Sequence, residues 1–322
     1  MLAASPRQLA WRRLRRNRGA LLAGAAFLLV VLSCLLAPLY ADHIAHRSPS
    51  DEPTGTETVR KGGEDVLILS LQGIPVGPTY HGEFFLGADT SGRDVAVRLL
   101  YGGRNSLMIG FGAAFVTTLL SMIVGLLAGY FRGPLDTALT ALMDIIWAFP
   151  VILLGIALGV ASAEDGLSLV VVKIPSGSLW LPIIIIAIVY VPYLARPVRG
   201  EVLALREKEF VEAARSQGMG SLRIMFREIL PNVVSLLIVF FPLMVANAIL
   251  LESALSFLGA GVQPPEPSWG TMLDDGVSRI ITAPYLAIVP GVMVVITVLT
   301  LNVFGDGVQQ ALNPRAKLTM EG

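Results

Sequence analysis

The sequence predicts an all-α membrane protein with six transmembrane helices. Of its 322 residues, 54% are hydrophobic and only 15% are charged, and the mean hydropathy is +0.69. A soluble domain carries about 25% charged residues. Long uncharged runs here reach the ~20 residues that an α-helix needs to cross a bilayer core about 30 Å thick. Because backbone groups in lipid must be hydrogen-bonded within their own segment, such runs are expected to be helices.

Six stretches have this length and composition: 19–40, 105–130, 137–161, 178–197, 231–257 and 284–305. The first could instead belong to a signal peptide, since arginines precede it. Its uncharged run, 19–41, is longer than the apolar region of about 7–15 residues that signal peptides contain. We therefore expect a retained first helix.

Basic residues predict that both termini lie in the cytoplasm, because loops on that side are enriched in Lys and Arg. Five of the arginines before the first span lie close together: Arg12, Arg13, Arg15, Arg16 and Arg18. The loop 199–230 holds six basic residues, whereas 162–177 and 258–283 hold one each. The expected organisation is a cytoplasmic N-terminus (1–18), a first transmembrane helix (19–41), an extracytoplasmic loop (42–103), a five-helix core (104–310) and a cytoplasmic tail (311–322). Within the first loop, 47–65 is expected to be flexible and 66–71 could form a short strand.

Motifs for catalysis or cofactor binding are missing from the sequence. None of the four lysines is followed by Ser or Thr, so there is no G-x-x-x-x-G-K-[ST] phosphate loop, and no ATPase site is expected in this chain. The three histidines have no metal-ligand spacing, so neither a metal nor another cofactor is expected. Net charge is zero, which gives no reason to expect a nucleic-acid partner. A motor-independent channel or carrier and an intramembrane enzyme stay as alternatives, although no inverted repeat, proton relay or catalytic dyad supports them.

The loop 199–230 is longer than a connection between two spans requires. Residues 199–217 are expected to be helical, with Gly218 in the left-handed conformation that ends many helices. Ser221 could cap a second helix. Its apolar positions, Leu222, Met225, Phe226 and Ile229, recur at intervals of three and four and predict one apolar stripe. That stripe suits either a docking element for a partner or a helix lying on the membrane surface.

Four motifs resemble one family, the ABC-importer permeases. E-A-A-R-S-Q-G at 212–218, followed by L-P-N at 230–232, is similar to their E-A-A-x-x-x-G loop, and it departs at Glu228, where the dipeptide branch usually has histidine. The blocks 86–107, 258–273 and 304–315 resemble the C-type subunit of dipeptide, oligopeptide and nickel systems. The resemblance implies the type I ABC-importer permease fold in a bacterial or archaeal plasma membrane.

The resemblance also implies partners and a coupling site. A second homologous permease, two ABC ATPase subunits and an extracytoplasmic substrate-binding protein would complete the importer within membrane lipid. The residues that would couple the permease to an ATPase are Glu209, Glu212, Ala213, Ala214 and Gly218. Peptides are the expected substrate, with nickel, an oligosaccharide or another small solute as alternatives.

Three polar residues within the apolar stretches are candidates for the translocation path or its gate: Asp144, Asn247 and Glu252. A carboxylate at the centre of a span costs about 3 kcal/mol on insertion scales, so it normally has a function or a partner. The sequence shows no obvious basic partner for Asp144 or Glu252. The alternative is that these residues form helix-to-helix hydrogen bonds.

Overall fold

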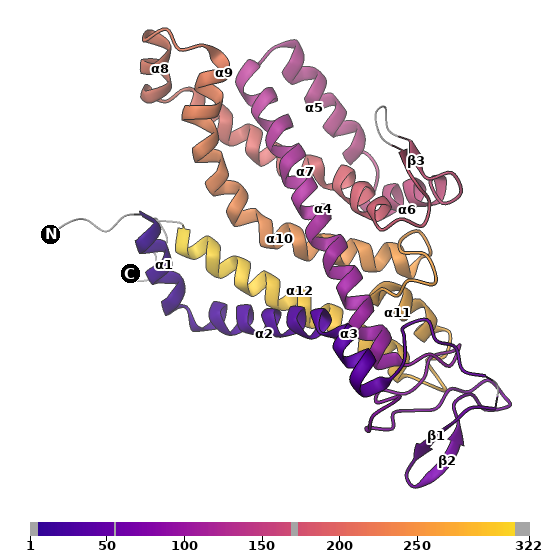
Figure 1. Ribbon diagram of the computed structural model, residues 1–322. Helices are drawn as coiled ribbons and strands as arrows, with labels where there is room; N and C mark the ends of the chain where they lie inside the picture. Colours follow the sequence, from indigo (N-terminus) through magenta and orange to yellow (C-terminus); the bar gives the residue numbers. More distant parts are fainter. Residues whose placement is uncertain (1–5, 55, 169–172, 313–322) are drawn as a thin grey trace.

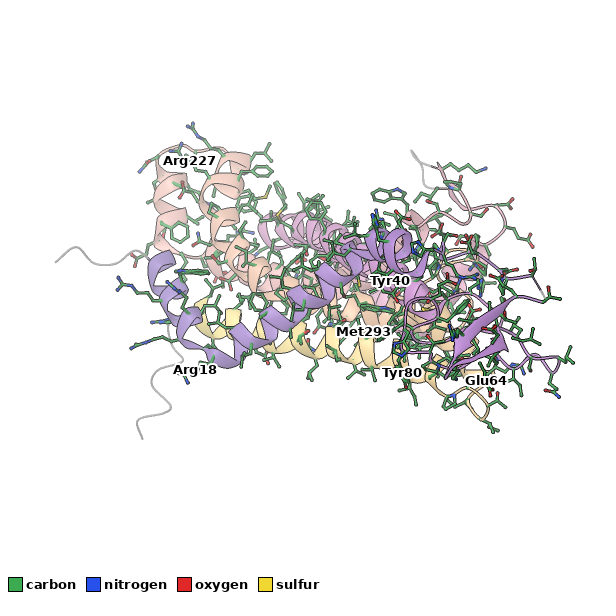
Figure 2. All side chains as sticks on the ribbon, turned by 60° about the horizontal axis from the view of Figure 1, so that its bottom comes forward. Arg18, Tyr40, Glu64, Tyr80, Arg227 and Met293 are labelled. Carbon is green, nitrogen blue, oxygen red and sulfur yellow. The ribbon has the colours of Figure 1, made fainter. Side chains whose placement is uncertain are left out.

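The computed structural model describes residues 6–54, 56–168 and 173–312, and it shows an elongated helical protein with two distinct ends (Figure 1). Arg18 and Arg227 lie at one end, which we call the arginine end, and Tyr80 and Glu64 lie at the other, the loop end (Figure 2). The arginine end carries α1 (Pro6–Arg16), α8 (Glu209–Ser216) and α9 (Ser221–Ile224). The expected tail falls outside the described residues from 313 onward.

Five helices are long and apolar enough to cross a membrane within the described residues. They are α2 (Arg18–Leu35), α4 (Val95–Phe131), α7 (Trp180–Arg206), α10 (Leu230–Phe257) and α12 (Tyr285–Leu312). A sixth span requires two helices taken together, α5 (Pro134–Trp147) and α6 (Val151–Ala161), which are bent by 87° relative to one another. The protein is therefore an all-α membrane protein of five or six spans.

The expected span over 137–161 is divided by a bend at Pro150, and proline is a residue that can bend or open a helix. Pro150 has no N–H to donate and disfavours a helical conformation at Phe149. Pro150 itself is extended, with φ −54° and ψ 130°, and it becomes the N-cap of α6. The apolar composition is continuous across the break, which is why hydropathy alone did not reveal it.

The helix expected to begin near residue 105 begins ten residues earlier, at Val95. The Asp94 carboxylate caps it by accepting hydrogen bonds from the N–H groups of Ala96 (2.8 Å) and Val97 (3.2 Å). The same side chain accepts a 2.6 Å bond from the N–H of Phe84, so it also ties the preceding loop to the helix. Burial raises the pKa of Asp94, and these hydrogen bonds oppose that effect.

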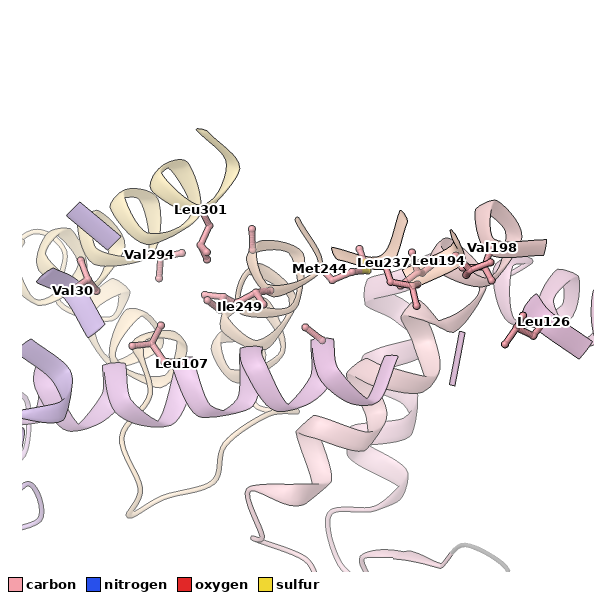
Figure 3. Close-up of a cluster of buried hydrophobic side chains, with 14 of the residues drawn as sticks. Val30, Leu107, Leu126, Leu194, Val198, Leu237, Met244, Ile249, Val294 and Leu301 are labelled. Carbon is pink, nitrogen blue, oxygen red and sulfur yellow. The ribbon is translucent and has the colours of Figure 1, made fainter. Parts of the chain in front are cut away.

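Glycines allow the long helices to approach closely. A Cβ at Gly125 of α4 would lie 2.5 Å from Val198 of α7, and a Cβ at Gly307 of α12 would lie 2.2 Å from the Cβ of Ala20 of α2. Small residues at such crossings are typical of helix packing in lipid, where van der Waals contact is the main attraction. The buried cluster between the helices is drawn in Figure 3; its labelled members are Val30, Leu107, Leu126, Leu194, Val198, Leu237, Met244, Ile249, Val294 and Leu301.

The loop end contains the remaining short elements. They are α3 (Ala37–Tyr40), a π-helix (Ala41–Ala45), the antiparallel hairpin of β1 (Thr58–Lys61) and β2 (Glu64–Leu67), the short pair β3 (Leu167–Ser168) and β4 (Lys173–Ile174), and α11 (Trp269–Val277). Part of the segment expected to be flexible therefore forms a hairpin, and the strand expected over 66–71 ends at Leu67. Trp269 anchors α11, because its side chain is fully buried and its Nε1 donates to the Leu99 carbonyl at 3.1 Å.

Candidate functional site

The short helix α8 presents a mixed surface at the arginine end. Glu209, Phe210, Glu212 and Ala213 are exposed, whereas Val211 and Ala214 are buried against the rest of the loop. Ala214 was expected to face a partner, but it faces its own chain. Phe210 was not among the expected coupling residues. The spacing of three between Val211 and Ala214 could have identified it, because a helix that buries these two side chains leaves Phe210 exposed.

Residues 199–217 were expected to be helical throughout, but they form two separate helices. The helix α7 ends at Arg206, and α8 begins at Glu209 with extended Lys208 before it. The two helices are therefore separate, and α8 can lie across the end of α7. Glu212 and Arg215 stand three residues apart on α8, but they are not among the ion pairs of the described residues.

Gly218 ends α8 as predicted. Its φ is +80°, which is the left-handed region that favours glycine. Its N–H donates to the Arg215 carbonyl at 2.9 Å, and the N–H of Met219 donates to the Ala214 carbonyl at 3.1 Å. These two bonds form a Schellman motif, which satisfies carbonyl groups at the helix end and fixes the direction of the chain that follows.

The second helix of the loop differs from the prediction in two ways. Gly220, not Ser221, occupies the cap position, and no side chain caps the helix. The helix then continues as a π-helix over Met225–Ile229 before α10, and this insertion shifts the buried face. Leu222 and Phe226 are exposed, while the buried side chains are those of Ile224, Met225 and Ile229.

Polar contacts join the base of this loop to the turn between α4 and α5. Arg206 donates to the Tyr130 carbonyl at 2.5 Å, and Arg132 pairs with Glu207. Nearby, α7 is also joined to α5. Arg199 of α7 donates two hydrogen bonds to the carboxylate of Asp136 of α5, with N–O distances of 2.6 and 2.7 Å. Because paired Arg–carboxylate contacts of this kind restrict orientation, α5 and α7 are held together beneath the loop.

Asp144 has a basic partner that is not apparent from the sequence. Arg196 of α7 donates from Nη2 to Asp144 Oδ1 at 2.6 Å, and the guanidinium group lies over the ring of Trp147, 4.3 Å from its centre. The partner is on another helix 52 residues away, so only the fold brings the two together. The side chains of Arg196 and Asp144 are 37% and 62% exposed in this chain, so the pair lies at its surface.

A row of aromatic rings leads from this ion pair toward Asn247. The ring centres of Trp147 and Tyr193 are 6.4 Å apart, and those of Tyr193 and Tyr190 are 6.3 Å apart. The Tyr190 hydroxyl then donates to the Asn247 carbonyl at 3.4 Å. The row thus extends from Arg196, the partner of Asp144, to the backbone of α10 at Asn247.

Glu252 lies elsewhere, at the centre of a group of serines. Its side chain is fully buried, and Ser256 donates to its Oε1 at 2.8 Å. Ser106 of α4 and Ser268 at the start of α11 lie near the same carboxyl group. Ser106 in turn accepts a hydrogen bond from the Trp269 N–H at 3.2 Å. Glu252 therefore links α4, α10 and α11, which is the geometry of the helix-to-helix alternative.

Comparison with known proteins gives the same fold and places the chain among transport components. Residues 121–318 match the family described as binding-protein-dependent transport system inner membrane component, and 5–52 match the N-terminal transmembrane domain of oligopeptide transport permease C. Among curated relatives, the dipeptide transport system permease protein DppC of Alkalihalophilus pseudofirmus is 36% identical over 98% of this chain and 92% of its own length. The glutathione transport system permease protein GsiD of Pectobacterium atrosepticum is 41% identical over 72% and 73% of the two chains.

A solved structure supports the fold independently. An inward-facing structure of the MetNI methionine ABC transporter aligns with a TM-score of 0.53 at 19% sequence identity. The alignment covers 67% of this chain and 96% of that chain. At this identity the likeness concerns the fold, and it agrees with the type I ABC-importer permease fold that the motifs imply.

Proposed function

Because the chain belongs to the family of binding-protein-dependent transport system inner membrane components, we propose that it conducts peptides through the membrane together with a second, homologous permease. It is a multi-pass inner membrane protein and a permease subunit of an ABC importer, a class that works with ATPase subunits and a substrate-binding protein. We assign ATP hydrolysis to the partner subunits. The proposal of a peptide substrate rests on relatives that are named as dipeptide, peptide and glutathione permeases.

The observation that carries this proposal is the geometry of the loop around α8. The helix is a separate, glycine-terminated unit whose charged and aromatic side chains, Glu209, Phe210 and Glu212, are exposed at the arginine end. Such a unit suits insertion into a groove of a partner protein. We place this end, with both termini, in the cytoplasm, where the surplus of basic residues predicts it.

The contacts below the loop supply a route for coupling. When an ATPase subunit moves α8, the polar contacts of Arg206, Arg132 and Arg199 carry that displacement to the turn before α5 and to α5 itself. The bent pair α5 and α6 then changes position relative to the second permease. Two alternative arrangements of such packed helices are what alternating access requires.

The exposed face of α5 and α7 is our candidate for the wall of the translocation path. The Asp144–Arg196 pair is partly exposed in this chain, and charged groups are expected to face water or protein and not lipid tails. Asp144 and Asn247 belong to this wall through the aromatic row. We propose for Glu252 a supporting role at the outer end, since its carboxyl group does not reach the surface of this chain.

The test is uptake by the reconstituted transporter that depends on ATP and on the substrate-binding protein. Labelled peptides, nickel and oligosaccharides are compared as substrates. Glu212→Lys should abolish peptide uptake, because it reverses the charge of an exposed contact at the ATPase surface, while the protein remains in the membrane. Glu164→Lys is the matched control, since Glu164 is also exposed but lies in the connection between α6 and α7. Unchanged uptake in Glu212→Lys would contradict the assignment of the coupling loop, and uptake of nickel or a sugar alone would contradict the peptide substrate.

A further inference from the structure

We propose that α1 is a docking surface for anionic phospholipids in the leaflet at the arginine end. The phosphate groups of the lipids bind to the exposed guanidinium groups of Arg12, Arg15 and Arg16, beside the ring of Trp11. This inference goes beyond the proposed function, because it concerns the lipid around the protein and neither the substrate nor the ATPase.

The charge on α1 has one sign only. Residues 6–18 contain six arginines and no acidic residue, and the first carboxylate of the chain is that of Asp42. Arg12, Arg15 and Arg16 are exposed, and none of them is among the ion pairs of the described residues. The helix packs against α12, whose one carboxylate, that of Asp306, is not among those ion pairs either. The exposed arginines are therefore available to an anion from outside the chain.

The direction of α1 changes where the first span begins. Asn17 separates α1 from α2 with ψ at 90°, an extended value, and its side chain caps α2 by accepting a hydrogen bond from the Ala20 N–H at 3.1 Å. In both views α1 runs across the direction of α2 (Figures 1 and 2). Because α2 crosses the bilayer, a helix in this direction lies along the membrane surface.

The start of α2 sets the depth at which α1 lies. Leu22 is 71% exposed and Leu29 is 68% exposed, on a helix that is long and apolar enough to span a membrane. Leu22 follows Arg18 by four residues, which is about 6 Å along the helix. The surface that faces lipid tails therefore begins within one turn of Arg18, and α1 lies at the level of the lipid headgroups.

Four neighbouring positions form the exposed face of α1. At about 100° per residue, Trp11, Arg15, Arg12 and Arg16 follow one another around the helix. All four side chains are exposed, with Trp11 at 60%, whereas Leu14 lies outside this arc and is partly buried. Tryptophan is enriched at the boundary between lipid and water, and the planar guanidinium group of arginine matches phosphate oxygens. This combination is typical of a helix that lies in the headgroup layer.

An ATPase subunit is the other partner to which a basic surface at this end could bind. The two surfaces are separate, because α8 packs against α7 and its own loop, whereas α1 packs against α12 and α2 (Figure 1). The surface adjoining α1 is the exposed apolar face of α2, which meets lipid. A basic cluster that directly precedes a span is attracted to anionic lipids in the same leaflet. The position of α1 therefore favours lipid as its partner.

The experiment identifies the lipid that lies at α1 in the complete transporter, reconstituted in phosphatidylcholine nanodiscs. Photoreactive phosphatidylglycerol or photoreactive phosphatidylcholine is added at the same mole fraction, and mass spectrometry measures how much of each attaches to residues 6–18. The ratio of the two yields cancels differences in protein amount between variants. The wild type should favour phosphatidylglycerol at least about tenfold, since each arginine near an anionic surface contributes a factor of about five. Replacing Arg12, Arg15 and Arg16 together by glutamine should lower this preference about tenfold.

Two further variants separate the lipid site from a general effect of charge. Replacing the same three arginines by lysine keeps the charge and should keep the preference. The matched control is Arg215→Gln, Arg223→Gln and Arg227→Gln together, which removes three exposed arginines from the loop at the same end and should also leave the preference unchanged.

Three results would overturn the proposal: no preference in the wild type, an unchanged preference in the glutamine variant of α1, or an equal loss in the control. Loss of the ATPase subunits from the α1 variant in detergent, with its lipid preference intact, would assign the surface to the ATPase and overturn the proposal as well. The measurement involves no transport, so its outcome does not depend on the substrate.

Discussion

Substitutions of Gly218 should show whether the fixed bend after α8 is needed for coupling. The residue has φ +80°, and a Cβ placed on it would have no neighbouring atom within 4 Å. A side chain therefore adds backbone strain and no steric clash. For a residue other than glycine this conformation costs about 1–2 kcal/mol, and less for asparagine, which adopts it more readily.

The magnitude separates three substitutions. Gly218→Asn and Gly218→Ala keep both hydrogen bonds of the Schellman motif, and the burial of Val211 and Ala214 also holds α8 in place. We expect them to retain at least about half of wild-type uptake, because a strain of about 1–2 kcal/mol is smaller than the packing it opposes. Gly218→Pro requires φ near −65°, about 145° away from the observed value, and removes the 2.9 Å bond to the Arg215 carbonyl. It should reduce uptake to a few per cent.

The assay measures peptide uptake and the ATP turnover that the substrate-binding protein stimulates, at equal amounts of assembled transporter. Gly218→Pro should lower both quantities, since the ATPase would no longer engage the loop in its native orientation. Equal activity for all three variants and the wild type would refute the reasoning. Loss of activity in Gly218→Ala as severe as in Gly218→Pro would refute it as well, because a steric or chemical role of the glycine would then be required.

Three further outcomes follow from the packing. Gly307→Ala should destabilise the contact between α2 and α12 by about 1–3 kcal/mol, and Ala20→Gly should restore it in the double variant, as measured by thermal unfolding of the purified transporter; failure of the rescue would exclude this contact as the cause. Asp94→Ala should cost about 2 kcal/mol through the lost helix cap, whereas Asp94→Asn should cost less because it keeps an acceptor and removes a buried charge, and equal losses would contradict this. Glu252→Ala should lower the free energy of unfolding by about 3 kcal/mol, because the hydroxyl of Ser256 loses its acceptor. Glu252→Gln should lower it by about 1 kcal/mol. A transport defect in a fully stable Glu252→Gln variant would instead indicate a direct role in the path.

Features that depend on local chain chemistry could be predicted from the sequence. The uncharged runs identified five spans, and the sixth run corresponds to the bent pair α5 and α6. Gly218 could be recognised as a helix end because glycine adopts a positive φ with little cost, and the conformation is observed. The family motifs could also be recognised, since each is a short run of neighbouring residues, and the family match covers most of the same residues.

Features that depend on residues far apart in the chain could not be predicted. The partner of Asp144 is 52 residues away, and the serines near the Glu252 carboxyl group belong to three separate parts of the chain, around residues 106, 256 and 268. The apolar stripe predicted over 222–229 does not form one face, because Leu222 and Phe226 are exposed whereas Met225 and Ile229 are buried against the rest of the chain.

By itself the sequence determined that this protein lies in a membrane, where its spans run and to which family it belongs. These properties depend on the hydrophobic composition of single helices and on short motifs, which are local features of the chain. The tertiary structure alone decided which polar groups meet inside the membrane. Pairing Asp144 with Arg196 requires α5 and α7 to pack in one particular register, and the second ion pair between the same helices, Arg199 with Asp136, forms in that register. It also decided that Ala214 supports the coupling loop from within while Phe210 is exposed, because the docking of α8 on its own chain chooses the face that remains for a partner.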